Sequence, residues 1–124
     1  MIHVIATIEL RAGARDSFLA DFARLAPEVR AEDGCIEYAA AVDVASGIGA
    51  QIPPRPDVVV VVEKWDTLLA LEAHLDARHM HEHRRRVAPF AVRTTLQVLK
   101  PADGSPTLHI EQDIVLGCYF LTYE

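Results

Sequence analysis

Three side chains in the middle of the chain have types and spacing that could support chemistry. Glu63 and Trp65 end an apolar run, Val58 to Trp65, and His74 follows in the next segment. Because successive side chains of a strand point to opposite faces, Glu63 and Trp65 would share one face of this strand. A carboxylate beside an indole suits a pocket mouth better than an inert core, and a histidine there could exchange a proton. We therefore expect these three residues to form part of a site.

A run of alternating histidines over residues 79–83 could also bind a metal ion. His79 and His83 stand at i and i+4 and would share a helix face. Structural zinc needs about four protein ligands and catalytic zinc about three, and no further ligand is near them in the sequence. Cys35 is distant and on a different element. We expect no metal site here, and expect His81 and His83 at the protein surface.

The segments that must position these residues follow the order strand, helix, strand, strand, helix, strand. Hydrophobic periodicity predicts strands over 2–10, 36–44, 58–65 and 93–99, and helices over about 14–30, 67–76 and 78–87. In the first helix, Asp21 is placed among the polar positions of the helical wheel. Pro27 should kink or split that helix, because proline removes a backbone hydrogen bond.

This order predicts an α+β, ferredoxin-like βαββαβ fold, in which an antiparallel sheet carries both helical segments on one face. The first and third strands nevertheless carry apolar side chains on both faces. The face without helices must therefore be buried by something else, and a second copy of the sheet is the simplest candidate. We expect a homodimer or a higher homo-oligomer.

Composition narrows the functional classes. A chain of 124 residues with 51% hydrophobic content fits one folded domain. The net charge of −6 argues against general binding to nucleic acid or to anionic membranes. No apolar run approaches the roughly 20 residues that span a bilayer, and no leader pattern follows Met1. Two isolated cysteines fit a reducing compartment, so we expect a cytoplasmic protein.

Four motifs in this order resemble the antibiotic biosynthesis monooxygenase (ABM) superfamily. They are the first strand (1–10), Glu-Asp-Gly-Cys-Ile-Glu-Tyr (32–38), Val-Glu-Lys-Trp (62–65) and Glu-Ala-His-Leu-Asp-Ala-Arg-His-Met (72–80). The resemblance covers roughly residues 1–101 and is strongest to the quinol monooxygenase group. It implies a dimeric α+β barrel and cofactor-independent oxidation of a quinol, an anthrone or a similar electron-rich aromatic by O₂.

The resemblance also implies roles for individual residues. His74, His79 and Glu63 are the expected catalytic residues, with His74 as first candidate for the base, and Tyr38 and Trp65 are the expected substrate-binding residues. Each also has a structural interpretation, such as core packing for Trp65. Two further functions stay open, namely a non-catalytic small-ligand-binding barrel and haem degradation. Haem-degrading relatives carry an asparagine in the first strand, where this chain has Ala6-Thr7, so haem is disfavoured.

The end of the chain departs from the family pattern. We expect a domain over residues 1–101 and a C-terminal extension over residues 102–124. The extension contains an apolar run, residues 114–121, which would be prone to aggregation if left free. We expect it to dock on its own domain or on the dimer partner, as a strand on a sheet edge.

Overall fold

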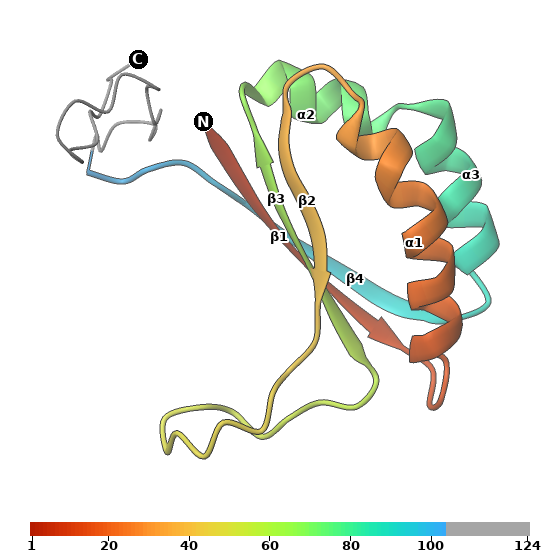
Figure 1. Ribbon diagram of the computed structural model, residues 1–124, viewed down its shortest axis with the longest axis vertical. Coiled ribbons are helices and arrows are strands. Elements are labelled where there is room, and N and C mark those ends of the chain that lie inside the picture. The colour runs from red at the N-terminus through yellow and green to blue at the C-terminus, as the bar shows by residue number, and fades with distance from the viewer. Residues whose placement is uncertain (104–124) are drawn as a thin grey trace, which may run out of the picture.

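Four antiparallel strands form one sheet, and three helices cover one of its faces, in a computed structural model that describes residues 1–103 (Figure 1). The elements are β1 (Ile2–Leu10), α1 (Arg15–Arg30), β2 (Cys35–Ala41), β3 (Val58–Trp65), α2 (Leu68–Leu75), α3 (Arg78–Val87) and β4 (Ala91–Leu99). The strand order is β2-β3-β1-β4. This arrangement confirms the predicted ferredoxin-like α+β fold.

The alternation along β3 explains how this strand faces both the core and the surface. Its four helix-facing side chains, Val59, Val61, Glu63 and Trp65, are all buried, whereas the intervening side chains are half-buried. Central strand β1 pairs with β3 so that Ala6 lies opposite Val61 and Val4 opposite Glu63. The sequence period therefore places Glu63 on the inner face, beneath the helices.

Helix α1 is one helix, so the split that was one of the two outcomes predicted for Pro27 does not occur. Proline removes only its own backbone hydrogen bond, and the backbone N–H of Ala31 still donates to the Pro27 carbonyl at 3.2 Å. Asp21 is buried with the apolar stripe of the helix rather than exposed among the polar positions, since it lies close to Phe18 on the wheel. Strand β2 also ends earlier than predicted, at Ala41.

The predicted break between the last two helices is confirmed. The Thr67 hydroxyl caps α2 by accepting a hydrogen bond from the Ala70 N–H at 3.1 Å. Helix α2 ends at Leu75, and α3 begins at Arg78 after an extended residue, Ala77. The break gives the side chains of α2 and α3 different directions over the sheet, and both helices contribute to the site.

Within residues 1–103, no helix covers the sheet face opposite α1, α2 and α3 (Figure 1). Ile5, Val60 and Val62 lie on this face in neighbouring strands and are half-buried. Within residues 1–103, no helix is long and apolar enough to cross a membrane. The apolar run at 114–121, predicted to dock as a strand, lies outside the described residues.

Candidate functional site

A cavity of about 220 Å³ lies between the inner face of the sheet and the helices. Its walls are mainly apolar, with side chains from all four strands and all three helices. The polar side chains in its lining are Tyr38, Glu63, His74, His83, Arg84 and Thr94. A mostly apolar cavity with a few converging polar groups is the usual form of a small-molecule site.

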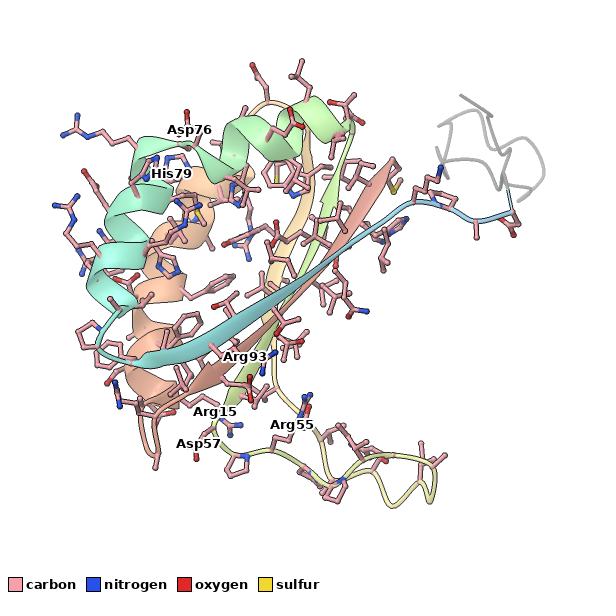
Figure 2. All side chains as sticks on the ribbon, turned by 180° about the vertical axis from the view of Figure 1, so that it is seen from behind. Arg15, Arg55, Asp57, Asp76, His79 and Arg93 are labelled. Carbon is pink, nitrogen blue, oxygen red and sulfur yellow. The ribbon has the colours of Figure 1, made fainter. Side chains whose placement is uncertain are left out.

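The five residues predicted for the site lie close together in the structure, but only three of them line the cavity. Tyr38, Glu63 and His74 line the cavity. Trp65 does not line it, because the indole is fully buried behind Glu63 and His74. His79 lies outside it, at the junction of α2 and α3 near Asp76 (Figure 2).

Glu63 is a buried carboxyl group with an altered acidity. The Trp65 indole N–H donates to Glu63 Oε1 at 3.0 Å, so the alternation along β3 that puts both residues on one face also pairs them. Burial, opposed by the Trp65 hydrogen bond and assisted by the nearby charge of Glu32, raises the pKa of Glu63 to about 7. A carboxyl group with a pKa near neutrality, in an apolar cavity, is suited to general base catalysis at ordinary pH.

Two basic side chains of the sheet, Lys64 and Arg93, pair with other carboxylates than Glu63. Lys64 pairs with Glu37 at 3.2 Å, and Arg93 is nearest to Glu9 at 3.9 Å. Figure 2 shows Arg93 near Arg55 and Arg15, at the end of the sheet far from His79. No surface cation therefore neutralises Glu63 among the described residues.

His74 connects Glu63 to a second carboxylate. Its Nδ1 lies 2.9 Å from Glu32 Oε2, and its Nε2 lies 3.7 Å from Glu63 Oε1, which is too long for a hydrogen bond. Since a carboxylate can only accept, Nδ1 carries the proton, and Nε2 of the neutral ring has a free lone pair toward Glu63. Burial lowers the pKa of His74, although Glu32 opposes this effect. Near neutral pH the ring is therefore uncharged, and His74 and Glu63 do not form a salt bridge.

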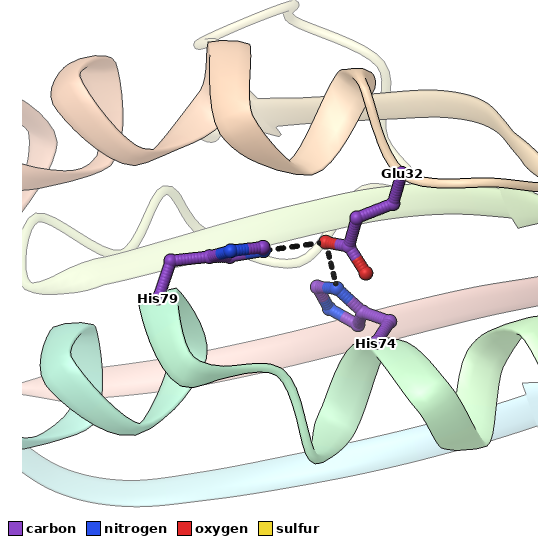
Figure 3. A group of neighbouring side chains, drawn as sticks. All are labelled: Glu32, His74 and His79. Carbon is purple, nitrogen blue, oxygen red and sulfur yellow. Dashed lines mark hydrogen bonds and ion pairs between the residues drawn. The ribbon is translucent and has the colours of Figure 1, made fainter.

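One carboxylate oxygen of Glu32 lies within hydrogen-bond distance of two histidines (Figure 3). The same oxygen, Oε2, lies 2.9 Å from His74 Nδ1 and 2.8 Å from His79 Nε2. These three ligand atoms lie within 4.8 Å of one another, so the cluster could offer a cation three ligands. Hydrogen bonds to one carboxylate already account for the whole arrangement, and we assign the cluster the role of fixing the orientation of His74. His79 and His83, the pair weighed as metal ligands, contact different carboxylates.

Tyr38 places a hydroxyl group in the cavity. Its ring stacks on Phe22 with centroids 5.1 Å apart and meets the edge of His74 at 5.5 Å. Its hydroxyl has no hydrogen-bond partner among residues 1–103 and is free to bind a ligand. Burial raises the pKa of Tyr38 well above its usual range, and the charge of Glu63 adds to this, so the hydroxyl remains a donor.

Sequence analysis missed three polar residues of this region. Glu32 lies in the turn after α1 and is the first residue of the motif at 32–38, but no spacing or residue pattern there assigned it a role. Asp21 and His83 are both buried, and His83 contradicts its predicted place at the surface. Helical spacing could have indicated both, because Asp21 lies between Phe18 and Phe22 and His83 recurs with Met80 and Val87.

Comparisons with known proteins agree with this architecture. The family model for antibiotic biosynthesis monooxygenase matches residues 1–86. The Escherichia coli (strain K12) protein named "Probable quinol monooxygenase YgiN" is 37% identical over 103 residues, which cover 82% of this chain and 98% of that protein. The solved structure of Rv0793 from Mycobacterium tuberculosis matches with a TM-score of 0.66 at 28% sequence identity. The match covers 82% of this chain and 95% of the Rv0793 chain. A solved antibiotic biosynthesis monooxygenase shares the fold, with a TM-score of 0.67 at 23% identity over 82% and 99% of the two chains. The chain belongs to the antibiotic biosynthesis monooxygenase family.

Proposed function

We propose that this protein is a monooxygenase that oxidises a quinol or a similar electron-rich aromatic with O₂ and without a cofactor. The observation that carries the proposal is the buried Glu63 carboxyl group, with a pKa near 7, in an apolar cavity beside Tyr38 and His74. The name of the Escherichia coli relative supports the substrate class. The cavity, at about 220 Å³, is smaller than the roughly 300–1,000 Å³ of pockets that bind drug-sized ligands, which favours a substrate of one or two rings.

The roles follow from the chemistry of a phenolic substrate. Glu63 accepts the proton of a substrate hydroxyl, while the Tyr38 hydroxyl donates a hydrogen bond to the resulting oxyanion. The aryloxide is electron-rich enough to reduce O₂ directly. One oxygen atom then enters the ring and the other leaves as water, so that a quinol and O₂ give a hydroxyquinone and water. His74, held by Glu32, provides a lone pair toward protonated Glu63 and can relay its proton.

Oxygen consumption tests this proposal. Protein freed of flavin and metal should consume O₂ when given benzene- or naphthalene-based quinols, at a rate well above autoxidation, and mass spectrometry should find one ¹⁸O atom from ¹⁸O₂ in the product. Heat-denatured protein serves as the control. Tight binding of these quinols without any O₂ uptake would contradict catalysis and favour a non-catalytic binding protein.

We also propose that the family's barrel forms here as a homodimer through the uncovered sheet face. The apolar side chains of Ile5, Val60 and Val62 on this face support an interface of obligate size, above about 2,000 Å² in total. Val62→Glu should convert the dimer to a monomer in light scattering, because it places a charge at the centre of the buried face. Leu69→Glu, at an exposed position on α2, is the matched control. A wild-type protein that is monomeric at micromolar concentration would contradict the proposal.

A further inference from the structure

A second carboxylate–histidine pair borders the cavity, separate from Glu32 and His74. His83 of α3 lies with Nδ1 at 2.6 Å from Asp21 Oδ2, and the Arg86 guanidinium donates to Asp21 Oδ1 at 2.6 Å. The side chain of His83 is more than nine-tenths buried, and it lines the cavity. The edge of its ring meets Phe18, at a centroid distance of 5.8 Å. Neither the relatives nor the proposed chemistry at Glu63 assigns this pair a role.

The partners of Asp21 fix which nitrogen of His83 carries the proton. Burial raises the pKa of Asp21, but the hydrogen bonds from Arg86 and His83 outweigh burial and hold it below its ordinary value. Asp21 is thus an acceptor, and Nδ1 of His83 must donate to it. Burial also lowers the pKa of His83, so the ring is neutral near pH 7. Its Nε2 therefore carries a lone pair.

That lone pair is available to a ligand. No residue within the described part of the chain hydrogen-bonds to His83 Nε2. No side-chain nitrogen or oxygen in the described residues is sealed from solvent without a partner, so Nε2 keeps solvent access, and His83 is one of the residues that line the cavity. Anchoring α3 to α1 would require only the Nδ1 contact. An oriented imidazole with a free acceptor in an apolar cavity is better matched to a bound hydroxyl group.

The two sets of polar groups approach the cavity from different places. Tyr38 and His74 pack against each other near Glu63, whereas His83 packs against Phe18, one helical turn before Phe22. A ligand with a single oxygen at Glu63 would leave His83 facing apolar atoms. We propose that His83, held by Asp21, accepts a hydrogen bond from the second hydroxyl group of the quinol and so makes the site prefer the diol to the mono-ol that lacks this group. This inference rests on the proposed function and adds a specificity-determining residue to it.

Anaerobic calorimetry tests the inference without turnover. Naphthohydroquinone and the naphthol that lacks its second hydroxyl should bind the wild-type protein with affinities that differ by about tenfold, in favour of the diol. His83→Phe should abolish this preference by weakening the diol alone. His83→Asn places an amide where Nδ1 meets Asp21 but has no atom at Nε2, so it should also lose the preference while preserving the anchor. His83→Gln places an amide near the Nε2 position and should restore most of it.

The outcomes are distinguishable. His81→Asn is the matched control, because His81 is an exposed histidine of the same helix and does not line the cavity. Equal binding of diol and mono-ol by the wild type, or an unchanged preference in both His83→Phe and His83→Asn, would overturn the inference. A loss of affinity for both ligands alike in His83→Asn would assign His83 a structural role and overturn it as well. Failure of the wild type to bind either ligand would remove the proposed function itself.

Discussion

Glu63→Gln should lower the rate of quinol oxidation by roughly 10²- to 10³-fold, the contribution expected of a positioned general base. Glutamine keeps the shape of the side chain and an oxygen that can still accept from the Trp65 indole, so the cavity should be preserved. What is lost is the capacity to take a proton from the substrate hydroxyl. The measurement is the rate of O₂ uptake at saturating quinol, compared with the wild type.

Glu37→Gln provides the control for this substitution. Glu37 is a half-buried glutamate on neighbouring strand β2, where it pairs with Lys64 and does not line the cavity. Its substitution should leave the rate within about twofold, because exposed ion pairs contribute little. Oxidation by Glu63→Gln at the wild-type rate, with quinol binding intact, would exclude Glu63 as the base and leave His74 as the next candidate.

The pH dependence of the rate gives a second test of the same role. A base must be ionised to accept a proton, and the pKa of Glu63 is raised to about 7, chiefly by burial. The logarithm of the wild-type rate should thus rise with pH below about 7 and level off above it. Trp65→Phe removes the hydrogen bond that lowers this pKa, so the rising limb should move to higher pH. If the pH–rate profile of Glu63→Gln kept the same rising limb as the wild type, the ionisation behind that limb would belong to the substrate or to a group other than Glu63.

Gly34→Ala should destabilise the fold by about 2–5 kcal/mol. Gly34 has a φ of +81°, a conformation that costs other residues about 1–2 kcal/mol. A Cβ added there would lie 2.7 Å from the Cβ of Ala70 on α2, and relieving such an overlap in a packed structure typically costs about 1–3 kcal/mol. Gly34 is also tied to the end of β3, because its carbonyl accepts from the Asp66 N–H at 2.8 Å. Urea unfolding of the variant measures the loss.

Gly47→Ala separates the two causes. Gly47 has nearly the same φ, +76°, but no heavy atom lies within 4 Å of an added Cβ. It should therefore cost only the conformational part, about 1–2 kcal/mol. Equal losses in free energy of unfolding for the two variants would show that α2 moves away from Gly34 without cost. Because Glu32 and His74 meet across this same contact between the turn and α2, such freedom would also weaken the proposed orientation of His74.

The sequence by itself determined the elements and the inner face of the sheet. The period of two along β3 placed Glu63 and Trp65 on one face of the strand, and the structure confirms that they share a face, which is the buried one. Hydrophobic spacing located α2, and with it His74. These features depend on local backbone geometry, which neighbouring residues specify without knowledge of the rest of the fold.

Only the tertiary structure decided which polar groups meet. Glu32 stands 42 residues before His74, and Asp21 stands 62 before His83, so no local period relates either pair. Charged residues are rarely buried without partners, and this base rate favoured placing Asp21 and His83 at the surface. Their burial is possible because α1 packs against α3, which brings Asp21 and His83 within hydrogen-bond distance of each other. Arg86 on α3 gives Asp21 a second partner. The energy of a buried polar group depends on partners from distant segments, and for that reason the packed fold alone fixes these pairs.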